Sequence, residues 1–178
     1  MRVALDTNVL AYVEGMNGEE RQGPAIALVQ ALAKGATLVP VQALGELYNV
    51  LVRKSGWSGD QARAAILTWR DAFSLAPTTG AAIVAAADHR LGIWDSLMVA
   101  VAAEGDCRLL LSEDTQDGFS WRRVPVVNPF APKRHPLLDA LLDEAGGPEA
   151  CTAQRNKCPI ASKTERQDRA AGCRAEAC

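Results

Sequence analysis

The sequence predicts an α/β fold in which a parallel β-sheet is flanked by α-helices. Short apolar runs, such as residues 2–5 and 108–111, have the length and composition of strands. Longer segments with apolar residues at helical spacing separate these runs, and strands that alternate with helices indicate a parallel sheet. Acidic residues follow both runs closely, at Asp6 and Asp114, where such sheets bind their ligands.

Strands and helices alternate in the first part of the chain. Pro24 is favoured in the first turn of a helix and Gly35 just after the last turn, so one helix is expected between them. Leu44, Leu47 and Leu51 recur at the spacing of a core-facing helix. The expected elements are a strand at 2–5, a helix at 7–14, a helix at 24–34, a strand at 38–39 and a helix at 41–54.

The second part of the chain continues this alternation. Ser58 and Gln61 have the spacing of a capping box, which predicts the start of a helix. Asp95 opens a helix that is apolar on nearly every side, as a buried helix is. The expected elements are helices at 58–73, 79–89 and 95–104, strands at 75–76, 108–111 and 125–127, and a helix at 137–145.

The length of 178 residues suits one domain with a tail. We expect a folded domain over residues 1–132 and a C-terminal extension over residues 133–178. The extension starts with the short helix, and the polar segment at 146–178 lacks periodicity, which predicts disorder. Four of the five cysteines lie in that segment without a C-x-x-C pair, so free thiols are expected rather than a zinc site or disulfides.

Composition narrows the class of protein. No apolar run is long enough to span a bilayer, and the N-terminus lacks the pattern of a signal peptide, so we expect a cytoplasmic protein without a membrane partner. The formal net charge of −2 argues against tight nonspecific binding of nucleic acid by the whole chain. Glycine motifs for nucleotide binding are absent, and the two histidines have no partner at metal spacing.

Four acidic residues lie where one predicted element changes to the next. A carboxylate at a buried edge is costly unless a cation compensates its charge. Several carboxylates that converge on one pocket therefore indicate a divalent metal with oxygen ligands. The four candidate ligands are Asp6, Glu46, Asp95 and Asp114.

Each of these residues also has an ordinary structural interpretation. Asp6 suits the N-cap of the helix that follows it, and Asp95 suits the positive end of a helix dipole. Glu46 belongs to a polar stripe that includes Arg53, which fits either a solvated helix face or the wall of a pocket. Arg53 is placed to contact substrate only if this stripe forms the wall of a pocket.

The segment around Asp114 has the composition of a turn. Asp117 precedes a glycine and suits that turn, whereas Asp114 lies nearer the strand end and is the better candidate ligand. Ser112 is placed to bind water or substrate. Asn8 is placed to hold the carboxylate of Asp6 through a side-chain hydrogen bond.

Together these segments resemble a PIN domain, and most closely the toxin of VapBC-type toxin–antitoxin systems. The similarity covers about residues 1–130 and depends on the order and spacing of several motifs. They are Asp6-Thr7-Asn8, Gly45-Glu46-Leu47-Tyr48-Asn49, Ile93-Trp94-Asp95-Ser96-Leu97, Leu111-Ser112-Glu113-Asp114 and Val126-Val127-Asn128-Pro129-Phe130.

The resemblance implies a ribonuclease that depends on Mg²⁺ or Mn²⁺. Asp6 and Asp95 match the principal metal ligands. Glu46 and Asp114 match the remaining acidic positions, and Asp117 matches an alternative fourth position. The implied reaction is cleavage of single-stranded regions of RNA by metal-activated water, which leaves a 5′-phosphate. A cognate antitoxin and a homodimer are expected on the same basis.

Three other functions are compatible with parts of this pattern. The same scaffold serves nucleases that process RNA or cut DNA structures, although such enzymes usually need an appended binding domain. A nuclease-dead binding module would not need the acidic positions that the chain retains. A phosphotransferase of the haloacid dehalogenase type requires a second aspartate two residues after the first, and Asn8 occupies that position.

Overall fold

The computed structural model describes residues 1–88, 91–116 and 118–145, and within them six strands form one sheet in the order β3-β2-β1-β4-β6-β5. Neighbouring strands are parallel, except that β5 runs antiparallel to β6. The strands are β1 (Val3–Leu5), β2 (Thr37–Pro40), β3 (Ser74–Ala76), β4 (Leu109–Leu111), β5 (Ser120–Trp121) and β6 (Val124–Val127). The predicted parallel sheet is therefore confirmed.

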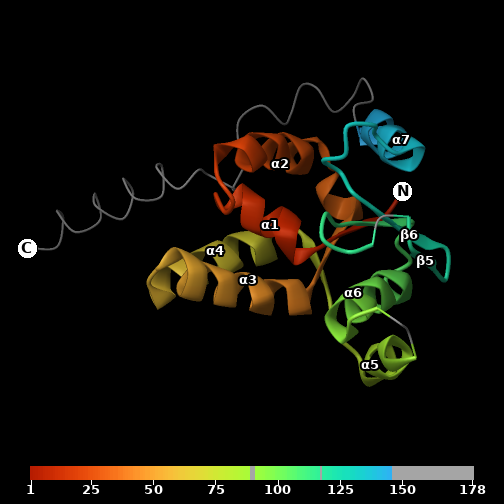
Figure 1. The fold of residues 1–178 in the computed structure, drawn as a ribbon, viewed down its shortest axis with the longest axis horizontal. Coiled ribbons are helices and arrows are strands. Elements are labelled where there is room, and N and C mark those ends of the chain that lie inside the picture. Colours follow the sequence, from red (N-terminus) through yellow and green to blue (C-terminus); the bar gives the residue numbers. More distant parts are fainter. Residues whose placement is uncertain (89–90, 117, 146–178) are drawn as a thin grey trace, which may run out of the picture.

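Helices flank this sheet, as predicted (Figure 1). They are α1 (Thr7–Val13), α2 (Glu19–Ala31), α3 (Val41–Ser55), α4 (Gly59–Ala72), α5 (Gly80–Ala87), α6 (Ile93–Glu104) and α7 (Pro136–Ala145). The helix α6 packs against the strands β2, β4, β5 and β6, and α5 packs on α6. The helix α1 contacts α2 and α3, and α3 contacts α4.

The register of the sheet brings the ends of two central strands together. Val3 pairs with Leu109 and Leu5 pairs with Leu111, so the residues that follow β1 and β4 lie at the same edge. The backbone N–H of Asp6 donates to the carbonyl of Leu111 at 3.0 Å. Leu5, Leu110 and their neighbours in both strands are fully buried, which fixes this register through the core.

The helix α7 belongs to the same core as the sheet. Its residues Leu138 and Leu141 are buried, and the Met1 ammonium group donates to the Glu144 carboxylate at 2.8 Å. The predicted helix at 137–145 is thus confirmed, whereas the predicted disorder of 146–178 concerns residues outside the described ranges. Among the helices of the described part, none has the length and apolar character that a bilayer crossing requires.

The predicted bounds of the second helix were wrong. The helix α2 begins at Glu19 after the N-cap Gly18, so Pro24 lies inside it, and it ends at Ala31. The two acidic residues of its first turn favour an earlier start, because they interact well with the positive end of the helix dipole. Leu32 then takes an extended conformation, and Gly35 lies in a short 3₁₀ turn at Lys34–Ala36.

The strand β5 was not predicted. It has two residues and forms a hairpin with β6, in which Ser120 pairs with Pro125 and Trp121 with Val124. Arg122 and Arg123 form the turn, and both have positive φ, at 45° and 68°. A hairpin turn of this kind is normally recognised by Asn-Gly or Gly-Gly, and this turn has Arg122 and Arg123 in their place.

Candidate functional site

Asp6 lies where β1 ends and α1 begins, and it has the cap role that its position predicted. Its Oδ1 accepts a hydrogen bond from the backbone N–H of Thr7 at 2.7 Å, which caps α1. Its Oδ2 accepts from Asn8 Nδ2 at 3.1 Å and from the Ser112 hydroxyl at 2.5 Å. Asp6 is only 7% exposed. The cap interpretation is therefore confirmed, and the site interpretation of the same side chain stays a prediction.

The charge of Asp6 is poorly compensated by these contacts. Burial raises the pKa of Asp6 from 3.8 to about 6, the charges of Glu46 and Asp95 act in the same direction, and the hydrogen bonds from Ser112 and Thr7 act against it. A buried carboxylate with neutral donors and acidic neighbours favours either a proton or a cation. Asp6 is therefore the strongest single indication of a cation-binding site.

A network of buried hydrogen bonds joins the end of β1 to the end of β4. Asn8 Nδ2 donates to the Ser112 hydroxyl at 3.1 Å, and Asn8 Oδ1 accepts from the backbone N–H of Glu113 at 3.3 Å. The Ser112 oxygen accepts from the backbone N–H of Thr115 at 3.2 Å and lies 3.0 Å from the Thr115 hydroxyl. Asn8 thus makes the hydrogen bond to Asp6 that was predicted for it. Ser112 is fully buried and donates to Asp6, and its contact with water or substrate stays a prediction.

Glu46 lies in α3 and is attached to α1. The Thr7 hydroxyl donates to Glu46 Oε2 at 2.7 Å, and Gln42 Nε2 donates to Glu46 Oε1 at 3.0 Å. Each oxygen of the carboxylate therefore has one neutral donor, and no ion pair with Glu46 occurs among the described residues. Because Thr7 follows Asp6 directly, its hydrogen bond fixes the position of Glu46 relative to the end of β1.

Asp95 lies in the first turn of α6. The prediction that it is the first residue of this helix was wrong. The helix begins at Ile93, its N-cap is Gly92, and the cap makes no side-chain hydrogen bond. Burial raises the pKa of Asp95, and the charges of Glu46 and Asp114 act in the same direction, whereas a hydrogen bond with Thr115 acts against them. These influences place Asp95 near both Glu46 and Asp114. The buried stretch from Ser96 to Ala102 holds the helix in the core.

The remaining candidates, Asp114, Asp117 and Arg53, differ in where they lie relative to the acidic side chains. Asp114 is exposed on the loop after β4, and its charge acts on Asp95. Asp117 lies outside the described residues. Arg53 is exposed in the last turn of α3, and no hydrogen bond or ion pair among the described residues joins it to the acidic side chains. Thr7 and Thr115 also form hydrogen bonds with Glu46 and Asp95, and no sequence signal predicted these contacts.

The loop after β4 is also anchored to α1 and α2. Glu113 accepts a hydrogen bond from the Tyr12 hydroxyl and forms an ion pair with Arg21, each at 2.5 Å. The ring of Phe130 packs edge-on against Tyr12 with centroids 5.6 Å apart, and the Arg21 guanidinium lies 5.8 Å from its centre. These contacts hold the segment that carries Ser112 and Asp114.

The donor set fits a hard divalent cation, although the carboxylates are not arranged as ligands. The charges of Glu46 and Asp95 act on Asp6, and those of Glu46 and Asp114 act on Asp95. Within the described ranges, however, no three acidic, histidine or cysteine side chains are placed to share one ion. Carboxylate and hydroxyl oxygens are the ligands that Mg²⁺ prefers, and burial, together with the charges of Glu46 and Asp95, raises the pKa of Asp6. We therefore consider the residues compatible with Mg²⁺ or Mn²⁺.

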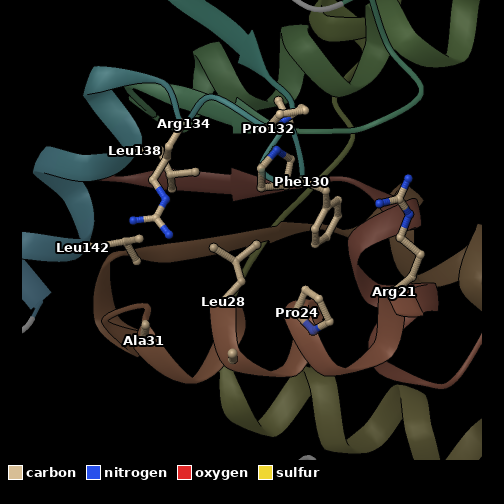
Figure 2. Close-up of a pocket in the computed structure, with 12 residues that line it drawn as sticks. Arg21, Pro24, Leu28, Ala31, Phe130, Pro132, Arg134, Leu138 and Leu142 are labelled. Carbon is tan, nitrogen blue, oxygen red and sulfur yellow. The ribbon is translucent and has the colours of Figure 1, made fainter. Parts of the chain in front are cut away.

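A hollow of about 610 Å³ lies elsewhere, between α2 and the segment that leads into α7 (Figure 2). Apolar side chains such as Leu28, Phe130 and Leu138 line it, with Arg21 and Arg134 among the lining residues. Its lining includes no carboxylate. The acidic chemistry of the chain is therefore at the sheet edge and not in this hollow.

The fold and the acidic edge define a parallel α/β domain with a candidate cation site at the carboxyl ends of its strands. The family model described as PIN domain matches residues 3–125, so the chain belongs to the PIN-domain family, as the resemblance predicted. Among curated proteins, none matches the chain.

Solved structures share this fold at low sequence identity. VapC20 of Mycobacterium tuberculosis, described as a toxin that cleaves the sarcin–ricin loop, has a TM-score of 0.54 and 20% identity over 64% of this chain and 91% of that one. VapBC2 of Rickettsia felis, bound to promoter DNA, has a TM-score of 0.52 and 12% identity over 71% and 97%. FitAB bound to a DNA fragment has a TM-score of 0.57 and 17% identity over 75% and 99%.

Proposed function

We propose that this chain is a metal-dependent endoribonuclease that cleaves single-stranded regions of RNA in the cytoplasm as the toxin of a toxin–antitoxin pair. The observation that carries this function is Asp6, a buried carboxylate whose pKa is raised by burial and by the charges of Glu46 and Asp95. Such a group is costly to the fold and is explained by a cation that it binds. Membership of the PIN-domain family and the fold shared with VapC20 and VapBC2 support the same function.

The side chains divide into ligands and supports. Asp6 and Asp95 would hold a divalent cation, with Glu46 and Asp114 as further acidic positions. Bound there, the cation would activate water, neutralise a nonbridging phosphate oxygen and stabilise the leaving group. Asn8 and Ser112 keep the Asp6 carboxylate oriented through their hydrogen bonds. Thr7 and Gln42 do the same for Glu46.

The expected protein partner is a small antitoxin that carries a cationic side chain. Among the described residues, no ion pair involves any of the four candidate ligands, Asp6, Glu46, Asp95 and Asp114. A basic residue inserted among Asp6, Glu46 and Asp95 would neutralise them and exclude the cation needed for cleavage. Several similar structures are of paired proteins, among them VapBC2 and FitAB, which supports a partner of this kind.

Removal of the metal should abolish cleavage. We expect the purified chain to cleave a single-stranded RNA oligonucleotide in Mg²⁺, to lose this activity in EDTA, and to regain it when Mg²⁺ is added in excess. The measurement is the rate of product formation on a denaturing gel, with the Asp95→Asn variant prepared in parallel to exclude a contaminating nuclease. Cleavage that proceeds equally well in EDTA would contradict the metal-dependent function.

A second copy of the chain is the other expected partner, and an exposed apolar surface supports it. The side chains of Val84 in α5 and Trp94 in α6 are 68% and 58% exposed, and Ile83 and Ile93 beside them are exposed as well. Apolar surface of this kind on one helix pair is typical of a protein interface. Because α5 packs on α6, these side chains belong to two adjoining helices.

The dimer is tested by a charge placed on this surface. Val84→Glu should convert a dimer into a monomer, because the carboxylate would lose its water in the interface. Light scattering after size-exclusion chromatography measures the mass directly. Ala64→Glu on the exposed face of α4 is the matched control and should leave the dimer intact. A monomeric wild-type chain at micromolar concentration would contradict the expected dimer.

A further inference from the structure

The turn between β5 and β6 has an unfavourable backbone conformation for its residues. Arg122 and Arg123 have φ values of 45° and 68°, in the left-handed region that favours glycine. Both are exposed, and the Arg122 guanidinium lies 4.5 Å from the centre of the Trp121 ring. Two glycines would adopt this turn without strain. The strained arginines therefore indicate a function that depends on their side chains.

Two further arginines lie at the same end of the neighbouring strands. Arg2 immediately precedes β1 and Arg108 immediately precedes β4, and the backbone N–H of Arg108 donates to the carbonyl of Arg2 at 2.8 Å. The parallel pairing of Leu110 with Val126 places Arg108 level with Val124, the residue that follows the arginine turn. We call Arg2, Arg108, Arg122 and Arg123 the arginine edge.

Little negative charge compensates the positive charge of the arginine edge. All four residues are exposed, and within the described residues none of their guanidinium groups forms an ion pair with a carboxylate. Asp106 is the acidic residue closest to them in the sequence, and on the pKa of the Cys107 thiol its charge opposes that of Arg2. Glu144 is paired with the Met1 ammonium group and adds no net charge. A chain with a net charge of −2 thus has a cationic edge.

This edge is opposite the acidic site. The arginines lie at the amino ends of β1, β4 and β6, whereas Asp6 and Ser112 follow the carboxyl ends of β1 and β4. The strands between them have three or four residues. At about 3.3 Å per residue, the two edges are separated by roughly 10–15 Å. One RNA strand is long enough to reach both edges.

We infer that the arginine edge binds the phosphate backbone of RNA at a distance from the bond that is cleaved. Guanidinium groups are well suited to phosphate, because their planar donors match two of its oxygens. An arginine stacked on tryptophan also offers a surface for an unpaired base. This inference rests on the proposed function, since RNA is the substrate of the acidic site. It assigns the cationic edge to holding RNA and the acidic edge to cleaving it.

The test separates charge from backbone strain at the turn. The probe is a fluorescein-labelled single-stranded RNA, whose binding is measured by anisotropy in EDTA at several salt concentrations, with Asp95→Asn in every protein to prevent cleavage. We expect Arg122→Gly/Arg123→Gly to weaken binding about tenfold and to reduce the salt slope by about 1.4, since each phosphate contact on single strands contributes about 0.7. The same variant should melt at a temperature a few degrees higher, because the strain is removed.

Two controls distinguish the possible results. Arg122→Lys/Arg123→Lys keeps the charge and the strain, so it should retain most of the binding and the original melting temperature. Lys54→Gln/Arg63→Gln removes two exposed charges from α3 and α4, away from β5 in Figure 1, and should change binding little. Unchanged affinity and salt slope in the glycine variant, or an equal loss in the α3–α4 control, would overturn the inference.

The failure of the proposed function would be recognised separately. If wild-type protein binds RNA through the arginine edge but does not cleave it in Mg²⁺, the nuclease function is wrong and the binding surface stands. If it cleaves RNA and the glycine variant binds RNA as tightly as its parent, the binding surface is wrong and the nuclease function stands.

Discussion

Asp95→Asn should reduce the rate of RNA cleavage by a factor of about a thousand and leave the fold intact. A bound metal ion contributes several kcal/mol to stabilisation of a transition state, and about 4 kcal/mol corresponds to a thousandfold change in rate. The change removes one charge from a principal metal ligand but keeps the size of the side chain. Because burial and the charges of Glu46 and Asp114 raise the pKa of Asp95, its neutral replacement should not destabilise the metal-free protein.

Asp60→Asn provides the matched control for this prediction. Asp60 lies in the first turn of α4, as Asp95 lies in the first turn of α6, but it is exposed and is not one of the four candidate ligands. If Asp95 served only to stabilise a helix dipole, both variants would lose a few tenths of a kcal/mol in unfolding free energy and keep full activity. Cleavage rates in Mg²⁺ and urea denaturation in EDTA decide between the two roles. Full activity of Asp95→Asn would contradict its assignment as a ligand.

The sequence predicted the parts of the structure that depend on local pattern and sheet topology. Asp6 and Asp114 were expected at one edge because both follow apolar strands, and parallel strands end on the same side. Glu46 was expected beside an apolar helix face because it belongs to a polar stripe. The contacts of Asn8 with Asp6 followed from a spacing of two residues.

Other features depend on packing between distant segments and were beyond sequence reasoning. Thr7 and Thr115 are ordinary residues of a helix start and a turn, and only the folded chain brings their hydroxyls to Glu46 and Ser112. The turn at Arg122 and Arg123 contradicts local preference, so no turn rule predicts it. The start of α2 was misplaced because Pro24 is tolerated inside that helix.

The metal-free protein should become more stable as the pH falls from 7 to 5. The folded pKa of Asp6 is about 6, whereas its ordinary value is 3.8. Between these values the folded state binds more protons than the unfolded state, so the free energy of unfolding rises as the pH falls. At about 1.4 kcal/mol for each pH unit below the folded pKa, the gain between pH 7 and pH 5 is about 1.4 kcal/mol, and the full effect of roughly 3 kcal/mol is reached only below pH 3.8. The pKa of Asp95 is also raised, so its contribution has the same sign.

A bound cation should reverse this dependence. In Mg²⁺ the ionised form of Asp6 is stabilised, so acidification releases the ion and lowers the free energy of unfolding. Urea denaturation at pH 5, 6 and 7, each in EDTA and in Mg²⁺, measures both slopes. Asp6→Asn should flatten the slope in EDTA, whereas Asp60→Asn should preserve it, since Asp60 is exposed. A metal-free protein that loses stability between pH 7 and pH 5 would show that Asp6 is already compensated, and the case for a cation at this edge would fail with it.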